Sequence, residues 1–314
     1  MNLPTQEDIK SMWTDDQNIK VSICCTAFNH ENYIEETLQG FLIQETKFPF
    51  EIIIHDDAST DKTLSIIKKY KDIYSDLITL IAQDKNQYSQ GKKVARDFIW
   101  SKAKGDYIAM CEGDDYWISK EKLQLQFDAL QADMKVDLCF HDHYNLDVYG
   151  KITPSLIHLD REMGIIGISE ILSSNGSFMS TASLMVKKVS LLNMPEWFSF
   201  TPVSDFFIQA VCSVNGALYL PQKMSVYRAF APGSWTSKFQ SMSPSELKTY
   251  LRLMDKSMED LGSFLGNKYP KEISYRRLML CLSGVKNSCL QFKLRPFFYF
   301  LSFSVVNFFR YLKN

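Results

Sequence analysis

The first 145 residues of the chain alternate between short apolar runs and segments in which apolar residues recur at helical spacing. The apolar runs span residues 21–27, 50–55, 77–82 and 107–111. Consecutive strands joined by helices pair in parallel, because each helix carries the chain back across one face of the sheet. This alternation therefore predicts an α/β fold with a mostly parallel, doubly wound sheet.

The remainder of the chain follows a different pattern. Strand and helix signals are mixed after residue 136, and helical signals prevail near the C-terminus. We therefore expect a domain over residues 1–240, with one half at 20–135 and the other at 136–240. A helical extension is expected over residues 241–314.

Acidic side chains directly follow two of the predicted strands. Asp56 and Asp57 come after the second strand, and Glu112, Asp114 and Asp115 come after the fourth. The carboxyl ends of parallel strands meet at one edge of a sheet, where such folds bind their ligands. Clustered carboxylates repel one another unless a cation neutralises them, and oxygen ligands suit Mg²⁺ or Mn²⁺. A solvated acidic turn is the alternative for either cluster alone, but two clusters at one edge favour a cation site.

Composition excludes several classes of protein. The net charge of -1 gives no reason to expect a nucleic-acid partner. Most of the seven cysteines lie in apolar runs and none forms a C-x-x-C pair, which indicates buried thiols rather than a disulfide framework or a zinc site. The N-terminal segment is polar and acidic, so we expect no signal peptide and a cytoplasmic location.

The C-terminal segment is basic and aromatic. Residues 261–314 carry nine basic side chains and one acidic side chain. Within this segment, residues 296–309 form an apolar run that is shorter than the roughly 18 residues a membrane-spanning helix needs. Such a helix, flanked by lysine and arginine, can lie in the interface of an anionic membrane, here the inner face of the cell membrane. The alternative is packing against the domain over residues 1–240 or against the second subunit of a homodimer.

Four segments together match a known pattern. They are residues 21–29, the I-x-D-D-x-S-x-D stretch that ends at Asp61, the acidic segment 112–117, and Ser204-Asp205 followed by Tyr227-Arg228 and Gly233-Ser234-Trp235. On these residues the chain resembles the family 2 glycosyltransferases, which have the GT-A fold. The resemblance covers residues 20–240 and is closest to the bacterial enzymes that make capsule and O-antigen polysaccharides.

The resemblance implies an enzyme. Its members transfer a sugar from a nucleotide-diphosphate donor, most often a UDP-sugar, to a hydroxyl group of a glycan or lipid-linked acceptor. It implies inversion at the anomeric carbon and a divalent metal, Mn²⁺ or Mg²⁺. A sugar-phosphate nucleotidyltransferase is an alternative, although residues 28–31 are not the Gly-rich basic loop that such an enzyme needs. A non-catalytic nucleotide-sugar-binding protein is another, and degraded acidic motifs would favour it.

The resemblance also implies roles for residues on the donor side. The nucleotide-sugar would contact Thr26, Phe28, Asp57, Lys92, Arg96, Glu112 and Asp114. Asp114 would also bind the metal, with Asp115 as a second ligand or as a neighbour of the first. Lys92 and Arg96 would meet the diphosphate, and the alternative for both is ordinary exposed helix charge.

Asp205 is the expected catalytic base. It stands in an apolar stretch, where burial would raise its pKa, and it also opens a helix as an N-cap. On the acceptor side the resemblance implies Arg228 and Trp235, and Trp117 and Ser183 are further candidates for contact with the acceptor. The two tryptophans are expected either as platforms for sugar rings or as core side chains.

Two residues depart from the family pattern. Phe230 stands where many relatives have a histidine that can ligate the metal, which predicts either weaker metal binding or a water molecule in the place of the histidine. Phe28 stands where tyrosine is common, which removes a hydroxyl group from the expected base pocket.

Overall fold

The computed structural model describes residues 3–14, 18–157, 160–174, 176–229, 238–239 and 241–290, and beyond them 304, 307, 308 and 311. The chain forms two compact units. The first comprises Met1–Ile166, Met179–Met194 and Asn215–Ala229, and the second comprises Gly167–Phe178, Pro195–Val214 and Phe230–Asn314. The second unit therefore takes in three segments of the domain expected over residues 1–240, namely 167–178, 195–214 and 230–240. The first two of these pack with helices of the expected extension.

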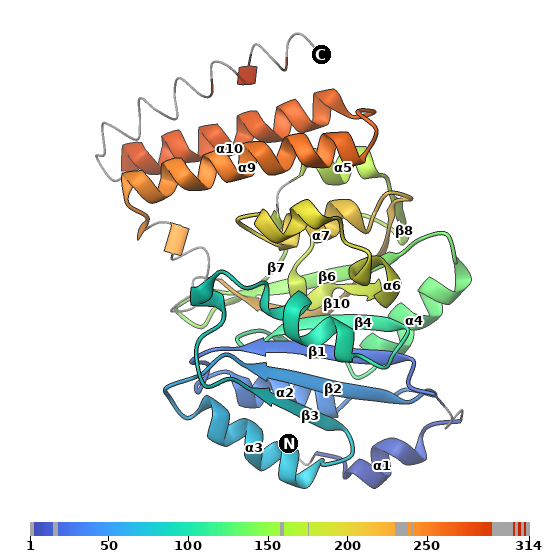
Figure 1. Ribbon diagram of the computed structural model, residues 1–314. Coiled ribbons are helices and arrows are strands. Elements are labelled where there is room, and N and C mark those ends of the chain that lie inside the picture. The colour runs from blue at the N-terminus through green and yellow to red at the C-terminus, as the bar shows by residue number, and fades with distance from the viewer. Residues whose placement is uncertain are drawn as a thin grey trace. The chain divides into compact units, whose positions relative to one another are not determined.

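The first unit is built on a 10-stranded sheet (Figure 1). Its strands are β1 (Val21–Ala27), β2 (Phe50–Asp56), β3 (Ile78–Ala82), β4 (Tyr107–Glu112), β5 (Tyr116–Trp117), β6 (Leu138–Leu146), β7 (Ile152–Pro154), β8 (Gly164–Ile166), β9 (Met185–Lys187) and β10 (Ala217–Arg228). Their order is β3-β2-β1-β4-β9-β6-β10-β5, with β7 beside β6 and β8 beside β10. Strands β3, β2, β1 and β4 are parallel, as expected, whereas β9 runs antiparallel to both its neighbours. The α/β prediction is confirmed, but the complete sheet is mixed.

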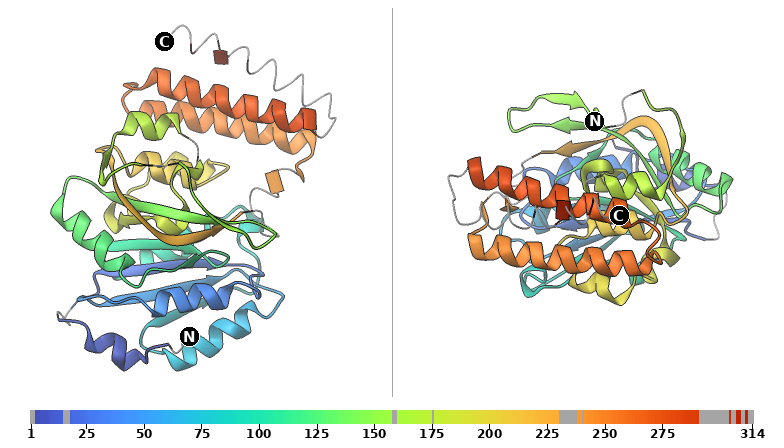
Figure 2. Two further views of the ribbon diagram at one scale, coloured as in Figure 1. Left: turned by 180° about the vertical axis from the view of Figure 1, so that it is seen from behind. Right: turned by 90° about the horizontal axis from the view of Figure 1, so that it is seen from above.

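Helices cover both faces of the parallel strands. Helices α2 (Ile34–Leu42) and α3 (Thr63–Ile73) follow β1 and β2, and α4 (Lys122–Ala132) follows β5. In Figure 1, α2 lies behind β2 and the segment Ala95–Lys102 lies in front, and the reverse view in Figure 2 brings α2 forward. The doubly wound arrangement thus holds around β1 and β2.

The segment Ala95–Lys102 is an irregular helix. A π-helix spans Ala95–Ile99, and a 3₁₀ turn spans Trp100–Lys102. Ile99 and Trp100 are adjacent in sequence and are 0% and 1% exposed. The segment Ala95–Ile99 contacts β1 and β2, so this irregular helix packs on the sheet.

Close packing fixes α2 against β5. A Cβ atom at Gly40 would lie 2.7 Å from the Trp117 carbonyl oxygen, so only glycine fits at this position of the helix. Phe41 packs edge to face on the Trp117 ring, with 4.8 Å between the ring centroids. Helix α2 therefore packs against β5 and supports the residues between β4 and β5.

The second unit is helical. It contains α5 (Ile168–Ser173), α7 (Asp205–Val211), α9 (Pro244–Phe264) and α10 (Pro270–Leu290). Helices α9 and α10 run side by side in every view of Figures 1 and 2, and the turn between them uses positive φ at Gly266 and Asn267. Arg277 joins the two helices, because its Nε donates to Asp255 Oδ1 at 2.6 Å.

None of the helices within the described part of the chain is both long and apolar enough to cross a membrane. The aromatic run expected at residues 296–309 lies mostly outside the described residues. The expectations of membrane-surface binding and of a homodimer that rest on it stay predictions.

Candidate active site

The two acidic clusters lie side by side at the carboxyl edge of the parallel strands. Ala27 of β1 pairs with Asp56 of β2, and Thr26 pairs with Glu112 of β4. The turns that follow bond back to β1: the Asp57 N–H donates to the Ala27 carbonyl and the Gly113 N–H donates to the Thr26 carbonyl, both at 2.9 Å. The end of β1 thus separates the two clusters by one strand.

The segment Glu112–Tyr116 is called the acidic loop from here on, and its three carboxylates differ in exposure. Glu112 is exposed, Asp114 is half-buried and Asp115 is 1% exposed. The Asp115 side chain turns inward, where its Oδ1 accepts the backbone N–H of Arg228 at 2.8 Å. Asp114 is therefore the carboxylate that the loop presents, and Asp115 fixes the loop to the end of β10.

Thr37 holds the acidic loop from the helix below. Its hydroxyl lies 2.7 Å from the Asp115 carbonyl oxygen, 3.0 Å from the Gly113 carbonyl oxygen and 3.3 Å from that of Tyr33. One hydroxyl proton serves three acceptors, so the hydroxyl acts as a shared anchor for the loop. Thr37 was not among the predicted site residues, and the signal in the sequence was a polar residue on the apolar face of an amphipathic helix; in the structure it is fully buried.

Asp57 is almost fully buried and organises a neighbouring loop. Its Oδ1 accepts the Gln87 N–H at 2.7 Å and its Oδ2 accepts the Tyr88 N–H at 3.0 Å. The Asn86 side chain donates to the Asp57 carbonyl at 3.1 Å. The carboxylate expected to meet the nucleotide thus shapes one wall of the site, and a carboxylate retains further lone pairs for a ligand.

The loops after β1 and β2 are bonded to each other. The Asn29 side chain accepts the Thr60 N–H at 2.8 Å, and Asp61 accepts the Glu31 N–H at 3.0 Å. Asn29 and Ala58 have φ values of 55° and 61°, and alanine rarely adopts this left-handed conformation. The strain at Ala58 is tolerated because the surrounding hydrogen bonds define this loop.

His30 packs against the acidic loop. A Cβ atom at Gly113 would lie 2.8 Å from His30 Nδ1, so glycine is needed for this approach. Burial lowers the pKa of the imidazole, although the charges of Asp114, Asp61 and Asp56 act to raise it. The sequence analysis assigned no role to His30 or Gly113.

Two other residues that are predicted to contact the nucleotide-sugar lie at the end of β1. Thr26 is half-buried and Phe28 is 41% exposed. An exposed phenyl ring beside buried carboxylates can cover a planar base. Lys92 is exposed and Arg96 is half-buried, and their contact with a diphosphate stays a prediction.

Two predicted acceptor residues are buried in the first unit. Trp117 is 2% exposed, and its Nε1–H donates to the Ala182 carbonyl at 2.8 Å. The Lys122 ammonium group lies 3.9 Å from the centroid of the Trp117 ring. Ser183 is 0% exposed and donates its hydroxyl to the Ser180 carbonyl at 2.6 Å. The structure therefore favours the core alternative for Trp117 and gives Ser183 no exposed surface.

Arg228 has a different environment. Its guanidinium lies over the rings of Tyr33 and Tyr116 and pairs with Glu36. Its side chain is 12% exposed, so most of it is covered by protein. Trp235 and Phe230 lie outside the described residues.

Asp205 belongs to the second unit, where it is the first residue of α7. Its side chain is exposed, so the burial expected for this carboxylate is not found. The apolar neighbours Phe206 and Phe207 point inward, because they occupy other positions around the helix. Asp205 is close enough to Tyr250 of α9 that its charge adds to burial in raising the pKa of that phenol to about 12.

The oxygen ligands of the acidic loop suit a hard cation only when other groups complete its coordination. In the described ranges, no three side chains among His, Cys, Asp and Glu converge as a ready-made metal site. Mg²⁺ is commonly held by one or two carboxylates together with substrate phosphates and water. The half-buried Asp114 carboxylate fits that mode, in which a nucleotide completes the ligand set.

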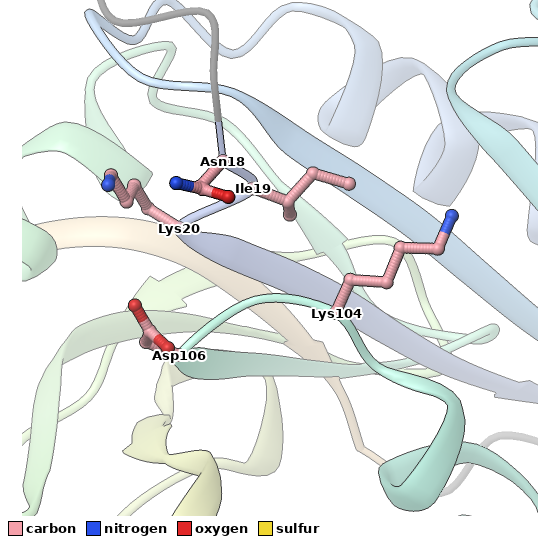
Figure 3. Close-up of a pocket in the computed structure, with 5 residues that line it drawn as sticks. All are labelled: Asn18, Ile19, Lys20, Lys104 and Asp106. Atoms are coloured by element: carbon pink, nitrogen blue, oxygen red, sulfur yellow. The ribbon is translucent and has the colours of Figure 1, made fainter.

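A pocket lies at the opposite end of the same strands. Figure 3 shows its lining residues just before β1 and β4, and they are Asn18, Ile19, Lys20, Lys104 and Asp106. Ligands of doubly wound sheets bind at the carboxyl ends of the strands, so this pocket is separate from the candidate site.

Several bacterial proteins are similar to this chain in sequence. An uncharacterized protein of Mycobacterium tuberculosis is 34% identical over 221 residues, which cover 70% of this chain and 61% of that protein. The chain thus spans less than two thirds of that relative's length. The UDP-Glc:alpha-D-GlcNAc-diphosphoundecaprenol beta-1,3-glucosyltransferase WfaP of Escherichia coli is 39% identical over 124 residues, which cover 40% of this chain and 46% of that enzyme.

Solved structures share the fold. TarS 1–349 of S. aureus in complex with UDP-GlcNAc superposes with a TM-score of 0.63 at 17% identity, covering 92% of this chain and 89% of that chain. The mannosyltransferase PcManGT of Pyrobaculum calidifontis, in complex with GDP-Man and Mn²⁺, gives a TM-score of 0.51 at 14% identity over 97% and 91% of the two chains. At such identities the likeness establishes the GT-A fold alone. Residues 22–190, more than half of the chain, match the profile of glycosyl transferase family 2, and the chain therefore belongs to that family.

Proposed function

We propose that this glycosyltransferase moves a sugar from a nucleotide-diphosphate donor to a hydroxyl group of a glycan or lipid-linked acceptor, with inversion at the anomeric carbon. The acidic loop carries this proposal. It presents the half-buried Asp114 carboxylate at the carboxyl edge of the sheet, beside the end of β1, while Asp115 and Thr37 fix the loop behind it.

The donor nucleotide would lie over the ends of β1 and β2. Thr26 and Phe28 would line the base pocket, and Asp57 with its bonded loop would form the wall beside the ribose. UDP is the proposed nucleotide, and it is supported by the UDP-Glc in the name of WfaP and the UDP-GlcNAc bound to TarS.

Asp114 would hold a divalent metal, Mn²⁺ or Mg²⁺, together with the diphosphate. When bound, the metal supplies Lewis-acid stabilisation of the charge that develops on the leaving diphosphate. Glu112 would contact the ribose or the metal from its exposed position, while Asp115 holds the loop. Lys92 and Arg96 would add positive charge toward the same diphosphate.

Asp205 would act as the general base. As the acceptor oxygen bonds to the anomeric carbon, the bond from that carbon to the diphosphate oxygen breaks, and the hydroxyl proton passes to the Asp205 carboxylate. Since Asp205 is exposed, we infer that the acceptor itself excludes water from the carboxylate. Trp235 and Arg228 are retained as proposed acceptor-side positions, although the burial of Arg228 limits its contact with a substrate.

The proposed setting is synthesis of a bacterial surface polysaccharide, such as capsule or O-antigen, at the inner face of the cell membrane. Support comes from the names of relatives. The name of WfaP gives alpha-D-GlcNAc-diphosphoundecaprenol, a lipid-linked sugar, as its acceptor, and a Bacillus subtilis relative is named a putative teichuronic acid biosynthesis glycosyltransferase.

Donor hydrolysis tests the proposal without a known acceptor. The protein with Mn²⁺ would be incubated with UDP-glucose or UDP-N-acetylglucosamine, and the anomer first released would be read by proton NMR. Both donors are α-linked, so we expect the β-anomer at early times and no release with Asp114→Asn. Release of the α-anomer by the wild type would contradict inversion, and an unchanged rate in the variant would contradict the role of Asp114.

A further inference from the structure

Arg228 ends strand β10 at the point where that strand meets the acidic loop. On one side, β10 pairs with β6 as far as Arg228 and Leu146, and the Ala229 N–H donates to the Leu146 carbonyl at 2.9 Å. On the other side, β5 pairs only with Ser225 and Val226. The backbone N–H of Arg228 donates instead to Asp115 Oδ1, at 2.8 Å. The acidic loop therefore depends on where the last residue of β10 lies.

The Arg228 side chain anchors that residue to helix α2. Its guanidinium carbon lies 4.9 Å from the ring centroid of Tyr33 and 4.8 Å from that of Tyr116, and it pairs with the Glu36 carboxylate. Tyr33 and Glu36 flank the start of α2, and Tyr116 ends the acidic loop. One side chain thus ties together the strand, the helix and the loop.

Burying the Arg228 guanidinium costs more free energy than placing it in a surface ion pair would. The side chain is 12% exposed, and its buried Nε–H reaches no acceptor among the described residues. A buried donor that lacks an acceptor destabilises the fold. A planar guanidinium that stacks on two rings while pairing with a carboxylate cannot be replaced by lysine without losing those contacts.

Resting on the proposed function, we propose that Arg228 is a positioning residue for the donor site: through Tyr33, Tyr116 and Glu36 it fixes the backbone N–H that holds Asp115, and thereby sets the orientation of Asp114 toward the metal–diphosphate group. This role differs from direct contact with an acceptor. It predicts that loss of the side chain weakens the metal-dependent part of nucleotide binding more than the metal-independent part.

Isothermal titration of the full chain with UDP, in the presence and absence of Mn²⁺, tests the proposal. Residues behind a metal ligand typically change metal affinity by about 10- to 100-fold. We expect Arg228→Ala to weaken UDP binding with Mn²⁺ by about tenfold and to leave binding without Mn²⁺ within about twofold. Arg228→Lys should fall between the two proteins, because it keeps the charge and loses the stacked plane.

Matched variants separate positioning from general stability. Lys120→Ala removes an exposed ion pair with Glu45, of 3.0 Å, and should leave both affinities unchanged. Glu36→Gln removes the ion pair but leaves the stacking rings, so it tests the anchoring of Arg228 to α2 if Arg228→Ala does not fold. The factor by which Mn²⁺ strengthens UDP binding, the Mn²⁺-dependent increment, should fall by about two- to threefold in this variant.

The outcomes are distinguishable. If Arg228→Ala and Glu36→Gln melt at lower temperatures but keep the full Mn²⁺-dependent increment, Arg228 is structural only and the inference is overturned. If the wild type shows no Mn²⁺-dependent increment, the metal part of the proposed function fails together with this inference. If Arg228→Ala loses UDP affinity equally with and without Mn²⁺, Arg228 contacts the nucleotide and does not act through the loop.

Discussion

The acidic loop and Asp205 would supply the two halves of the proposed chemistry, and the protein holds them differently. The loop is fixed by backbone and side-chain bonds from α2, β1 and β10, and its Asp115 is 1% exposed. Asp205 stands exposed at the first residue of a seven-residue helix in the second unit. We infer from this difference that the proposed donor site would be formed before substrate binds, whereas the proposed base would take on its working environment only with the acceptor present.

Replacing the exposed base should have the largest effect. Asp205→Asn keeps the size of the side chain but cannot accept the proton, and a general base contributes typically about 10²–10⁴-fold to rate. We expect kcat to fall by at least about 100-fold while the dissociation constant for UDP with Mn²⁺ is unchanged. Sugar transfer assays and titration measure the two quantities.

Glu196→Gln is the matched control, because Glu196 is also an exposed acid in the first turn of a helix of the second unit. It should retain full activity. Activity of Asp205→Asn equal to that of this control would remove Asp205 from the chemistry.

A buried lysine lies next to the well-fixed acidic loop. Lys122 is 0% exposed, donates to Gln126 Oε1 at 2.7 Å and lies under Trp117, next to the acidic loop. Burial lowers the pKa of its ammonium group to about 7. Between about pH 7 and pH 10, Lys122 is therefore protonated in the unfolded chain and neutral in the folded chain. Its contribution to the free energy of unfolding rises with pH over that interval.

Lys122→Met should abolish this rise and stabilise the protein most below pH 7. Each pKa unit corresponds to about 1.4 kcal/mol, so the difference in the free energy of unfolding between pH 7 and pH 10 should be a few kcal/mol larger in the wild type. Urea unfolding at both pH values gives the difference. Equal pH dependence in the two proteins would mean that Lys122 is charged in the folded state at pH 7 and above.

Removal of the Thr37 hydroxyl should loosen the acidic loop. Thr37→Val keeps the shape but leaves carbonyl groups of Gly113 and Asp115 without this donor, at a cost of about 1–3 kcal/mol in the free energy of unfolding. Thr37→Ser retains the hydroxyl and serves as the control. If Thr37→Val keeps full stability while Thr37→Ser loses it, packing of the methyl group, not the hydrogen bond, would be what Thr37 provides.

The smallest expected effect concerns Ala58, which follows Asp57 with φ of 61°. Glycine adopts this conformation without the steric cost of a Cβ atom, which is about 1 kcal/mol. Ala58→Gly should therefore raise the melting temperature by about 2 °C, with unchanged nucleotide affinity. A lower melting temperature would show that the hydrogen bonds between the loops do not compensate for the added freedom of the unfolded chain.

The fold and the position of the acidic clusters could be predicted from sequence, because both follow from local periodicity. The apolar runs that became β1, β2 and β4 are buried along their length, and the carboxylates follow them directly. The direction of each carboxylate could not be predicted. Asp115 points inward because of Arg228, a residue 113 positions away, and Asp205 points outward despite its apolar neighbours.

The role of Trp117 was likewise undetermined in sequence. A tryptophan beside an acidic motif suits a sugar platform or a core position equally well, and only Gly40, Phe41 and Lys122 around it decide for the core. These contacts join residues that are distant in sequence or that carry no motif. Side-chain packing of this kind leaves no local signal.

The central claim is that Asp114 binds a metal together with a nucleotide diphosphate, and calorimetric titration with UDP tests it most directly. The wild type should bind UDP at least about tenfold more tightly with Mn²⁺ than without it, and Asp114→Asn should lose that increment while it keeps the Mn²⁺-independent affinity. An Asp114→Asn variant that keeps the full increment would contradict the account.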